Sequence, residues 1–214
     1  MPHRILAAVV LALAMSAAPA KAANFTFTGN FVADNDVAVF GFVIGAPSVV
    51  TMFSSSWICG DCGFGFDPML GLWDSAGNPI QFQDDGGIAG ITDVDGTDYS
   101  HGVWDTYFTS GLLAAGSYLA TISQYSNFPI GGNLSNGFNF DGNPNFTFDL
   151  GFGAQAMFNG VWSGIDARTS FWRFHILNVE QATPPSAVPE PATLLLFGTG
   201  LAAAVVRRRT QGRK

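Results

Sequence analysis

Clustered aspartates are the residues of this sequence best suited to chemistry, because carboxylate oxygens bind hard divalent cations. Calcium takes six to eight oxygen ligands, and loops that gather several carboxylates supply them. The aspartates that lie close together along the chain are Asp34, Asp36, Asp84, Asp85, Asp93, Asp95 and Asp98. They are candidate calcium ligands. The alternative is a set of solvated turn residues, since aspartate favours turns by bonding to its own backbone.

Cys59 and Cys62 are the only cysteines, and they form a C-x-x-C pair. An even cysteine count in an exported protein is typical of a disulfide, which is the interpretation that we favour. A zinc site is the second interpretation, although the only histidines within the central region are His101 and His175. Free or redox-active thiols are the third, although no βαβ unit is indicated around the pair.

Other catalytic signals are weak. No G-x-S-x-G motif occurs, His101 lies in a polar turn, and His175 lies inside an apolar stretch typical of a strand. The sequence therefore predicts a protein that is not an enzyme. Most of the five tryptophans are expected in the core, but Trp57 precedes the cysteine pair and is the candidate for an exposed ring that stacks on sugars.

The charge distribution excludes one class of partner. The 214-residue chain has a net charge of −7, but its basic residues are concentrated at the two ends. Between Asn24 and Val188 only Arg168 and Arg173 are basic, against fifteen acidic residues, which gives 2 − 15 = −13. A domain this acidic repels phosphate backbones, so no nucleic-acid partner is expected.

The N-terminus has the features of a secretory signal. A basic start is followed by an apolar run over 5–15, which is too short to span a bilayer, and by two A-x-A sites that end at Ala20 and Ala22. We therefore predict that residues 1–23 form a signal peptide with a helical apolar segment. A short buried helix is the alternative.

The C-terminus has three parts. Residues 183–191 form a proline-rich linker, residues 192–206 are uncharged, and arginines follow at once. Fifteen helical residues span about 22 Å, somewhat less than a hydrocarbon core of about 30 Å. The motif residues are Pro189, Glu190, Pro191, Arg207, Arg208 and Arg209.

This order of parts resembles the PEP-CTERM sorting signal of Gram-negative bacteria. The resemblance implies a single transmembrane helix with an arginine stop over 192–209, and cleavage by the membrane enzyme exosortase near the Pro-Glu-Pro. The arginines are expected to stay in the cytoplasm, which places the upstream domain outside the inner membrane. A permanent single-span anchor is the alternative.

The region between the two signals predicts an all-β fold. Alternating or apolar runs bounded by turn residues indicate several strands, and an Asn/Gly-rich stretch over 126–145 indicates a long surface loop. The expected strands cover 25–28, 37–44, 48–55, 69–73, 79–82, 104–109, 116–125, 146–150 and 170–179. We predict one antiparallel, jelly-roll-like β-sandwich over 24–182.

A second resemblance covers about residues 30–125. The stretches Asp34-Asn35-Asp36-Val37-Ala38-Val39-Phe40, Phe66-Asp67-Pro68-Met69-Leu70-Gly71-Leu72-Trp73-Asp74, Asp84-Asp85-Gly86 and Leu113-Ala114-Ala115-Gly116-Ser117-Tyr118 occur in this order. The order resembles the bacterial pre-peptidase C-terminal (PPC) β-sandwich of secreted proteases and surface proteins. Related sandwiches sometimes bind calcium, which by resemblance points to Asp67, Asp84 and Asp85.

Together these features predict an exported protein that is transiently anchored in the inner membrane and then lies at the cell surface or outside. The expected role is a non-enzymatic surface or extracellular-matrix protein associated with exopolysaccharide or biofilm, with exosortase as processing partner. The alternative is a secreted hydrolase or a protease-associated accessory domain.

Overall fold

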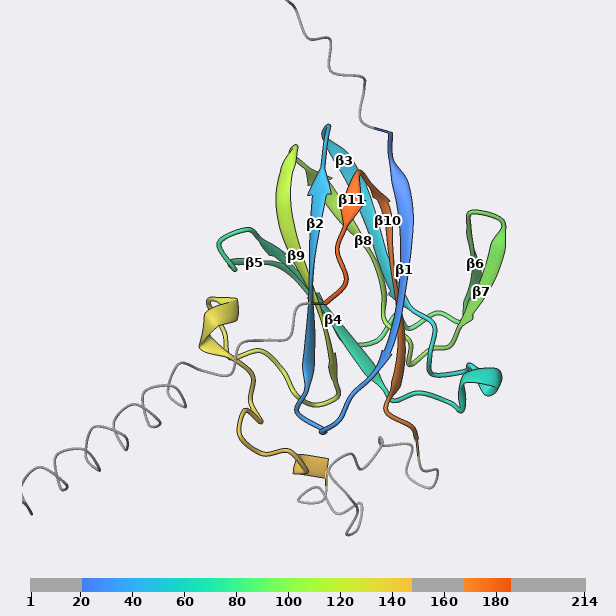
Figure 1. The fold of residues 1–214 in the computed structure, drawn as a ribbon, viewed down its shortest axis with the longest axis vertical. Coiled ribbons are helices and arrows are strands. Elements are labelled where there is room, and N and C mark those ends of the chain that lie inside the picture. The colour runs from blue at the N-terminus through green and yellow to red at the C-terminus, as the bar shows by residue number, and fades with distance from the viewer. Residues whose placement is uncertain (1–20, 148–167, 186–214) are drawn as a thin grey trace, which may run out of the picture.

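The computed structural model describes residues 21–147 and 168–185, which form a β-sandwich with a side hairpin (Figure 1). The strands are β1 (Ala23–Asn30), β2 (Val37–Ile44), β3 (Ser48–Ser54), β4 (Pro68–Asp74), β5 (Pro79–Gln83), β6 (Gly90–Val94), β7 (Thr97–His101), β8 (Tyr107–Leu113), β9 (Gly116–Gln124), β10 (Phe171–Val179) and β11 (Gln181–Ala182). Two 3-10 helices, η1 (Gly60–Cys62) and η2 (Leu134–Asn136), interrupt loops in the described ranges.

The strands pair into two main antiparallel sheets. One has the order β1-β10-β3-β8 and the other the order β11-β2-β9-β4-β5. The prediction of an all-β sandwich is therefore confirmed for the described residues. Thr183 extends the pairing beyond β11, because its backbone N–H donates to the carbonyl of Gly41 at 2.8 Å.

Aromatic side chains from both sheets fill the space between them. Strand β2 alternates buried and half-buried residues along its whole length, as expected for a strand with one face on the core. Phe40 of β2 contacts Phe174 of β10 with 4.9 Å between ring centroids, and meets Trp172 edge-on at 5.7 Å. Such pairs across the sheets hold the two layers together.

The β6–β7 hairpin was not anticipated from the sequence. Its turn places Asp95 and Gly96 at φ 54° and 87°, the two left-handed residues of a tight hairpin. The hairpin lies beside the four-stranded sheet (Figure 1), and Tyr99 packs on His175 of β10 with 4.4 Å between ring centroids. It therefore covers part of the outer face of that sheet.

Two predicted strands differ from the structure. The strand expected at 104–109 begins only at Tyr107, because Asp105 closes a turn by accepting a hydrogen bond from the N–H of Gly102 at 2.8 Å. Phe146 is helical rather than extended, next to Thr147, whose N–H donates to Asp34 at 3.1 Å; residues 148–150 lie outside the described ranges.

The predicted loop over 126–145 is confirmed, since it contains only η2 and an isolated bridge between Pro129 and Phe138.

Most of the predicted signal peptide and all of the sorting motif lie outside the described residues. Of the predicted signal peptide, only residues 21–23 are described, and Ala23 begins β1 directly after the second expected cleavage site. The predicted signal helix and the predicted transmembrane helix over 192–209 belong to these outlying segments. Within residues 21–147 and 168–185, no helix is long and apolar enough to cross a membrane.

Candidate metal centre

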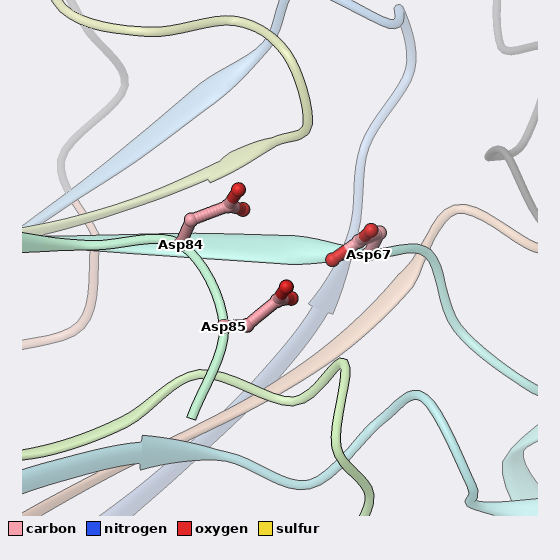
Figure 2. A group of neighbouring side chains, drawn as sticks. All are labelled: Asp67, Asp84 and Asp85. Atoms are coloured by element: carbon pink, nitrogen blue, oxygen red, sulfur yellow. The ribbon is translucent and has the colours of Figure 1, made fainter. Parts of the chain in front are cut away.

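Three carboxylates meet where β4 begins and β5 ends. Asp67 directly precedes β4, and Asp84 and Asp85 directly follow β5. Because these strands pair antiparallel, with Leu70 opposite Gln83, the start of one lies beside the end of the other. One oxygen from each carboxylate lies within 4.8 Å of the others, and Figure 2 shows Asp84 and Asp85 turned toward Asp67.

The cluster is withdrawn from solvent. Asp67 is only 5% exposed, while Asp84 and Asp85 are half-buried. Each of the three has a buried Oδ1 atom that accepts no hydrogen bond from the described part of the chain. Buried carboxylate oxygens are normally paired, so this arrangement calls for a proton or a cation.

Electrostatics supports the same conclusion. Burial, followed by repulsion from Asp84, Asp85 and Asp105, raises the pKa of Asp67 to about 8, although Arg168 acts in the opposite direction. Burial and the charge of Asp85 raise the pKa of Asp84 to about 6. Burial also raises the pKa of Asp85. A divalent cation would relieve this repulsion and hold all three groups ionised.

Asp105 and Thr106 position the loops that carry the cluster. Oδ1 of Asp105 accepts hydrogen bonds from Ser54 Oγ at 2.9 Å and from the backbone N–H groups of Ser56 and Trp57 at 3.0 and 3.1 Å. The Thr106 hydroxyl lies within hydrogen-bonding reach of two backbone carbonyl oxygens, those of Pro68 and Asp84. Pro68 directly follows Asp67, so Thr106 links the two segments that carry the carboxylates. Sequence reasoning missed both residues, since nothing local distinguishes Asp105 from an ordinary turn aspartate.

Oxygen donors fit calcium, which prefers carboxylates and carbonyls in a flexible shell of six to eight ligands. Three carboxylates would supply up to six oxygens, with water completing the shell. The donor set has no nitrogen or sulfur, which zinc prefers. The residues that would hold the ion are Asp67, Asp84 and Asp85.

The remaining acidic candidates lie elsewhere. Asp93, Asp95 and Asp98 are exposed on the β6–β7 hairpin and are not part of the carboxylate cluster. Asp93 accepts a hydrogen bond from the N–H of Gly96 at 3.2 Å, and Asp95 accepts one from Asn24 at 2.8 Å. These three aspartates are therefore exposed residues of the hairpin, and among the described residues they do not belong to the group formed by Asp67, Asp84 and Asp85.

The cysteine pair forms a disulfide, Cys59–Cys62, with S–S 1.98 Å. It closes a small loop around η1, and Arg173 Nη2 donates to Cys62 Sγ at 2.8 Å.

The expectation that Trp57 is exposed is wrong. Trp57 is 7% exposed, and its ring is covered by the Arg168 guanidinium, whose carbon lies 3.4 Å from the ring centroid. The Arg168 Nη1 also donates to the Trp57 carbonyl at 2.7 Å, which fixes the cation in place. Trp104, whose ring centroid is 6.2 Å from that of Trp57, is 43% exposed.

One serine and one histidine are in contact, but both are buried. His175 Nε2 lies 2.8 Å from Ser55 Oγ, and its Nδ1 lies 2.8 Å from Thr26 Oγ1. Ser55 is 1% exposed and His175 is fully buried. Burial, Arg173 and His101 together lower the pKa of His175 to about 3, so the ring is neutral. The two contacts join β1 and β10 to Ser55, the residue that follows β3.

Comparison with known proteins identifies the C-terminal segment. Residues 187–209 match the PEP-CTERM protein-sorting motif. A motif of this type implies an exported protein that is anchored in a membrane while exosortase processes it. No curated protein and no solved structure matches this chain significantly.

Proposed function

We propose that this chain is a non-enzymatic, calcium-binding protein of the cell surface or extracellular matrix. The observation that carries the proposal is the convergence of Asp67, Asp84 and Asp85 within 4.8 Å, with a buried and unpartnered oxygen on each. The protein's −13 charge between Asn24 and Val188 adds a general attraction for cations.

An extracellular location suits such a site. Calcium modules outside cells bind with Kd values of about 10⁻⁴ to 10⁻³ M, which is within reach of three carboxylates on loops. The PEP-CTERM match over 187–209 supports export and release from the inner membrane. Association with exopolysaccharide or biofilm is the role we assign to the released domain, and the PPC-like order of motifs over 30–125 is in keeping with a stand-alone surface sandwich.

A hydrolase is the less favoured candidate. The described residues bring one serine to one histidine, and neither Ser55 nor His175 is accessible to a substrate. A role as a protease-associated accessory domain depends on the PPC-like resemblance alone.

Calcium titration tests the proposal. The protein used is residues 23–188, which contain every strand and the whole described core. Isothermal titration is expected to show one calcium per chain with a Kd of about 10⁻⁴ to 10⁻³ M. Asp84→Asn should weaken binding at least tenfold, whereas Asp98→Asn, on the exposed hairpin, serves as the matched control and should leave it unchanged. Equal binding by both variants would exclude the site.

A further inference from the structure

A surface of five partly exposed apolar side chains lies at the loop end of the sandwich. We call it the Trp104 platform; its members are Ile58, Phe64, Ile88, Val103 and Trp104, which are 42%, 50%, 72%, 44% and 43% exposed. They come from the β3–β4, β5–β6 and β7–β8 loops. Figure 1 shows η1 and the base of the β6–β7 hairpin close together at this end.

Backbone hydrogen bonds and one close side-chain approach join the three loops. The N–H of Gly87 donates to the carbonyl of Val103 at 3.2 Å, and the N–H of Gly86 donates to the carbonyl of Asp105 at 2.9 Å. A Cβ at Gly102 would lie 2.8 Å from Ile58, which shows how closely the β3–β4 loop packs on the β7–β8 loop. The three loops that carry the platform are therefore packed against one another.

The platform is also rigid beneath its surface. The Arg168 guanidinium carbon lies 3.4 Å from the ring centroid of Trp57 and 5.8 Å from that of Phe64. Trp57 in turn supports Trp104. The disulfide and the Asp105 carboxylate fix the backbone of the same loops. A half-exposed ring on a rigid support binds a ligand with little loss of conformational entropy.

Size and charge limit what can occupy this surface. Five half-exposed side chains offer less than the roughly 800 Å² that each partner buries in a stable protein complex. The excess of fifteen acidic over two basic residues between Asn24 and Val188 repels anionic polymers and anionic lipid surfaces. A sugar ring, with one apolar C–H face and a rim of hydroxyls, matches an indole accompanied by a few other apolar side chains.

We propose that the Trp104 platform binds uncharged sugar rings of an extracellular polysaccharide, with the partly exposed indole of Trp104 as the stacking surface. This inference rests on the proposed matrix function and assigns its ligand class. It also places the ligand on the loops that carry the carboxylates, since Asp84, Asp85 and Ile88 belong to one loop.

Binding of defined oligosaccharides tests the inference. The probes are cellohexaose and the hexamer of N-acetylglucosamine, both neutral, and a hexagalacturonate as the anionic counterpart, each titrated into residues 23–188 in millimolar calcium. We expect at least one neutral probe to bind and to change tryptophan fluorescence, and the anionic probe not to bind. Trp104→Ala should raise the Kd about tenfold or more, equivalent to about 1.4 kcal/mol.

Two variants make the result specific. Trp104→Phe keeps an aromatic face and should restore most of the affinity, which a merely folding-related defect would not do. Leu112→Ala, at a side chain that is 73% exposed on β8, should bind like the unaltered protein.

The inference is wrong if neither neutral probe binds, if Trp104→Ala binds as tightly as the unaltered protein, or if the anionic probe binds equally well. A Trp104-dependent dimer in sedimentation would likewise overturn it. Calcium titration of the same samples separates the two proposals, because loss of sugar binding with intact calcium binding leaves the metal centre standing.

Discussion

Replacing Asp67 by asparagine should have opposite effects on stability with and without calcium. The pKa of Asp67 is about 8 in the folded protein, against about 3.9 for aspartate in an unfolded chain. At a pH between these two pKa values, Asp67 keeps its proton in the folded protein and loses it in the unfolded chain. Stability in chelator therefore falls as pH rises, by about 1.4 kcal/mol per pH unit, or by up to about 4 kcal/mol at pH 7.

Asp67→Asn removes this pH-dependent cost. It also buries a side-chain amide, whose desolvation destabilises the variant by about 1–3 kcal/mol. A net stabilisation of about 2 kcal/mol remains at pH 7 in chelator, and it should raise Tm by about 4–8 °C for a chain of this size. In calcium the order should reverse. Ion at 100 times the Kd of the unaltered protein stabilises it by about 2.7 kcal/mol. This exceeds the variant's advantage of about 2 kcal/mol, because the variant lacks the most buried of the three carboxylate ligands and is expected not to bind calcium at this concentration.

Thermal melts followed by circular dichroism, in chelator and in calcium at pH 7.0, measure this crossover. Asp98→Asn is the control for general charge reduction, and it should change Tm in the same direction under both conditions. If Asp67→Asn melts below the unaltered protein in chelator as well, the three carboxylates do not repel one another and the reasoning fails.

Three further outcomes are expected. Replacing Cys59 and Cys62 by serine opens a very short loop and should cost about 2 kcal/mol of unfolding free energy in urea, with calcium affinity unchanged; a protein that no longer folds would contradict this. Burial lowers the pKa of His175 to about 3 in the folded protein, against about 6.5 in an unfolded chain. Stability in saturating calcium should therefore decrease as pH falls from about 6.5 toward 3, by up to about 1.4 kcal/mol per pH unit. A flat profile of stability against pH in acid denaturation would exclude this role. Gly65→Ala should lower the free energy of unfolding by about 3 kcal/mol, since a Cβ at this position would lie 2.3 Å from the carbonyl oxygen of Phe171. Gly111→Ala is the control and should change Tm little, because a Cβ there would have no atom within 4 Å.

The sequence predicted the strands that have a clear hydrophobic pattern. The apolar run over 37–44 is β2, and the alternating stretch after Ala23 is β1. The β6–β7 hairpin was missed because its strands are polar and five residues long, so the only local signal was the Asp95-Gly96 turn. Short polar strands show their pairing only when the partner strand and the sheet beneath are known.

The candidate site was predicted only in part. Proximity along the chain made Asp93, Asp95 and Asp98 look like one ligand set, yet their hairpin exposes them to solvent. Asp67 lies seventeen residues before Asp84, and antiparallel pairing of β4 with β5 brings them together. Burial of Trp57 was equally beyond the sequence, because its cover is Arg168, which is 111 residues away along the chain.

The three carboxylates and the Trp104 platform lie on the same loops, which predicts how a bound calcium ion would act. The aromatic core around Phe40 and Phe174 lies between the sheets and includes none of the three carboxylates. Asp105 and the disulfide tie the β3–β4 loop independently of any ion. Removal of calcium should therefore loosen the β5–β6 loop, which carries Asp84, Asp85 and Ile88, before it affects the core. Amide hydrogen exchange would detect this as faster exchange confined to residues 84–89 and to 66–67, the end of the β3–β4 loop that carries the third carboxylate. Equal acceleration across β2 and β10 would mean instead that the ion stabilises the whole sandwich, and calcium would then act on folding rather than on the proposed sugar-binding surface.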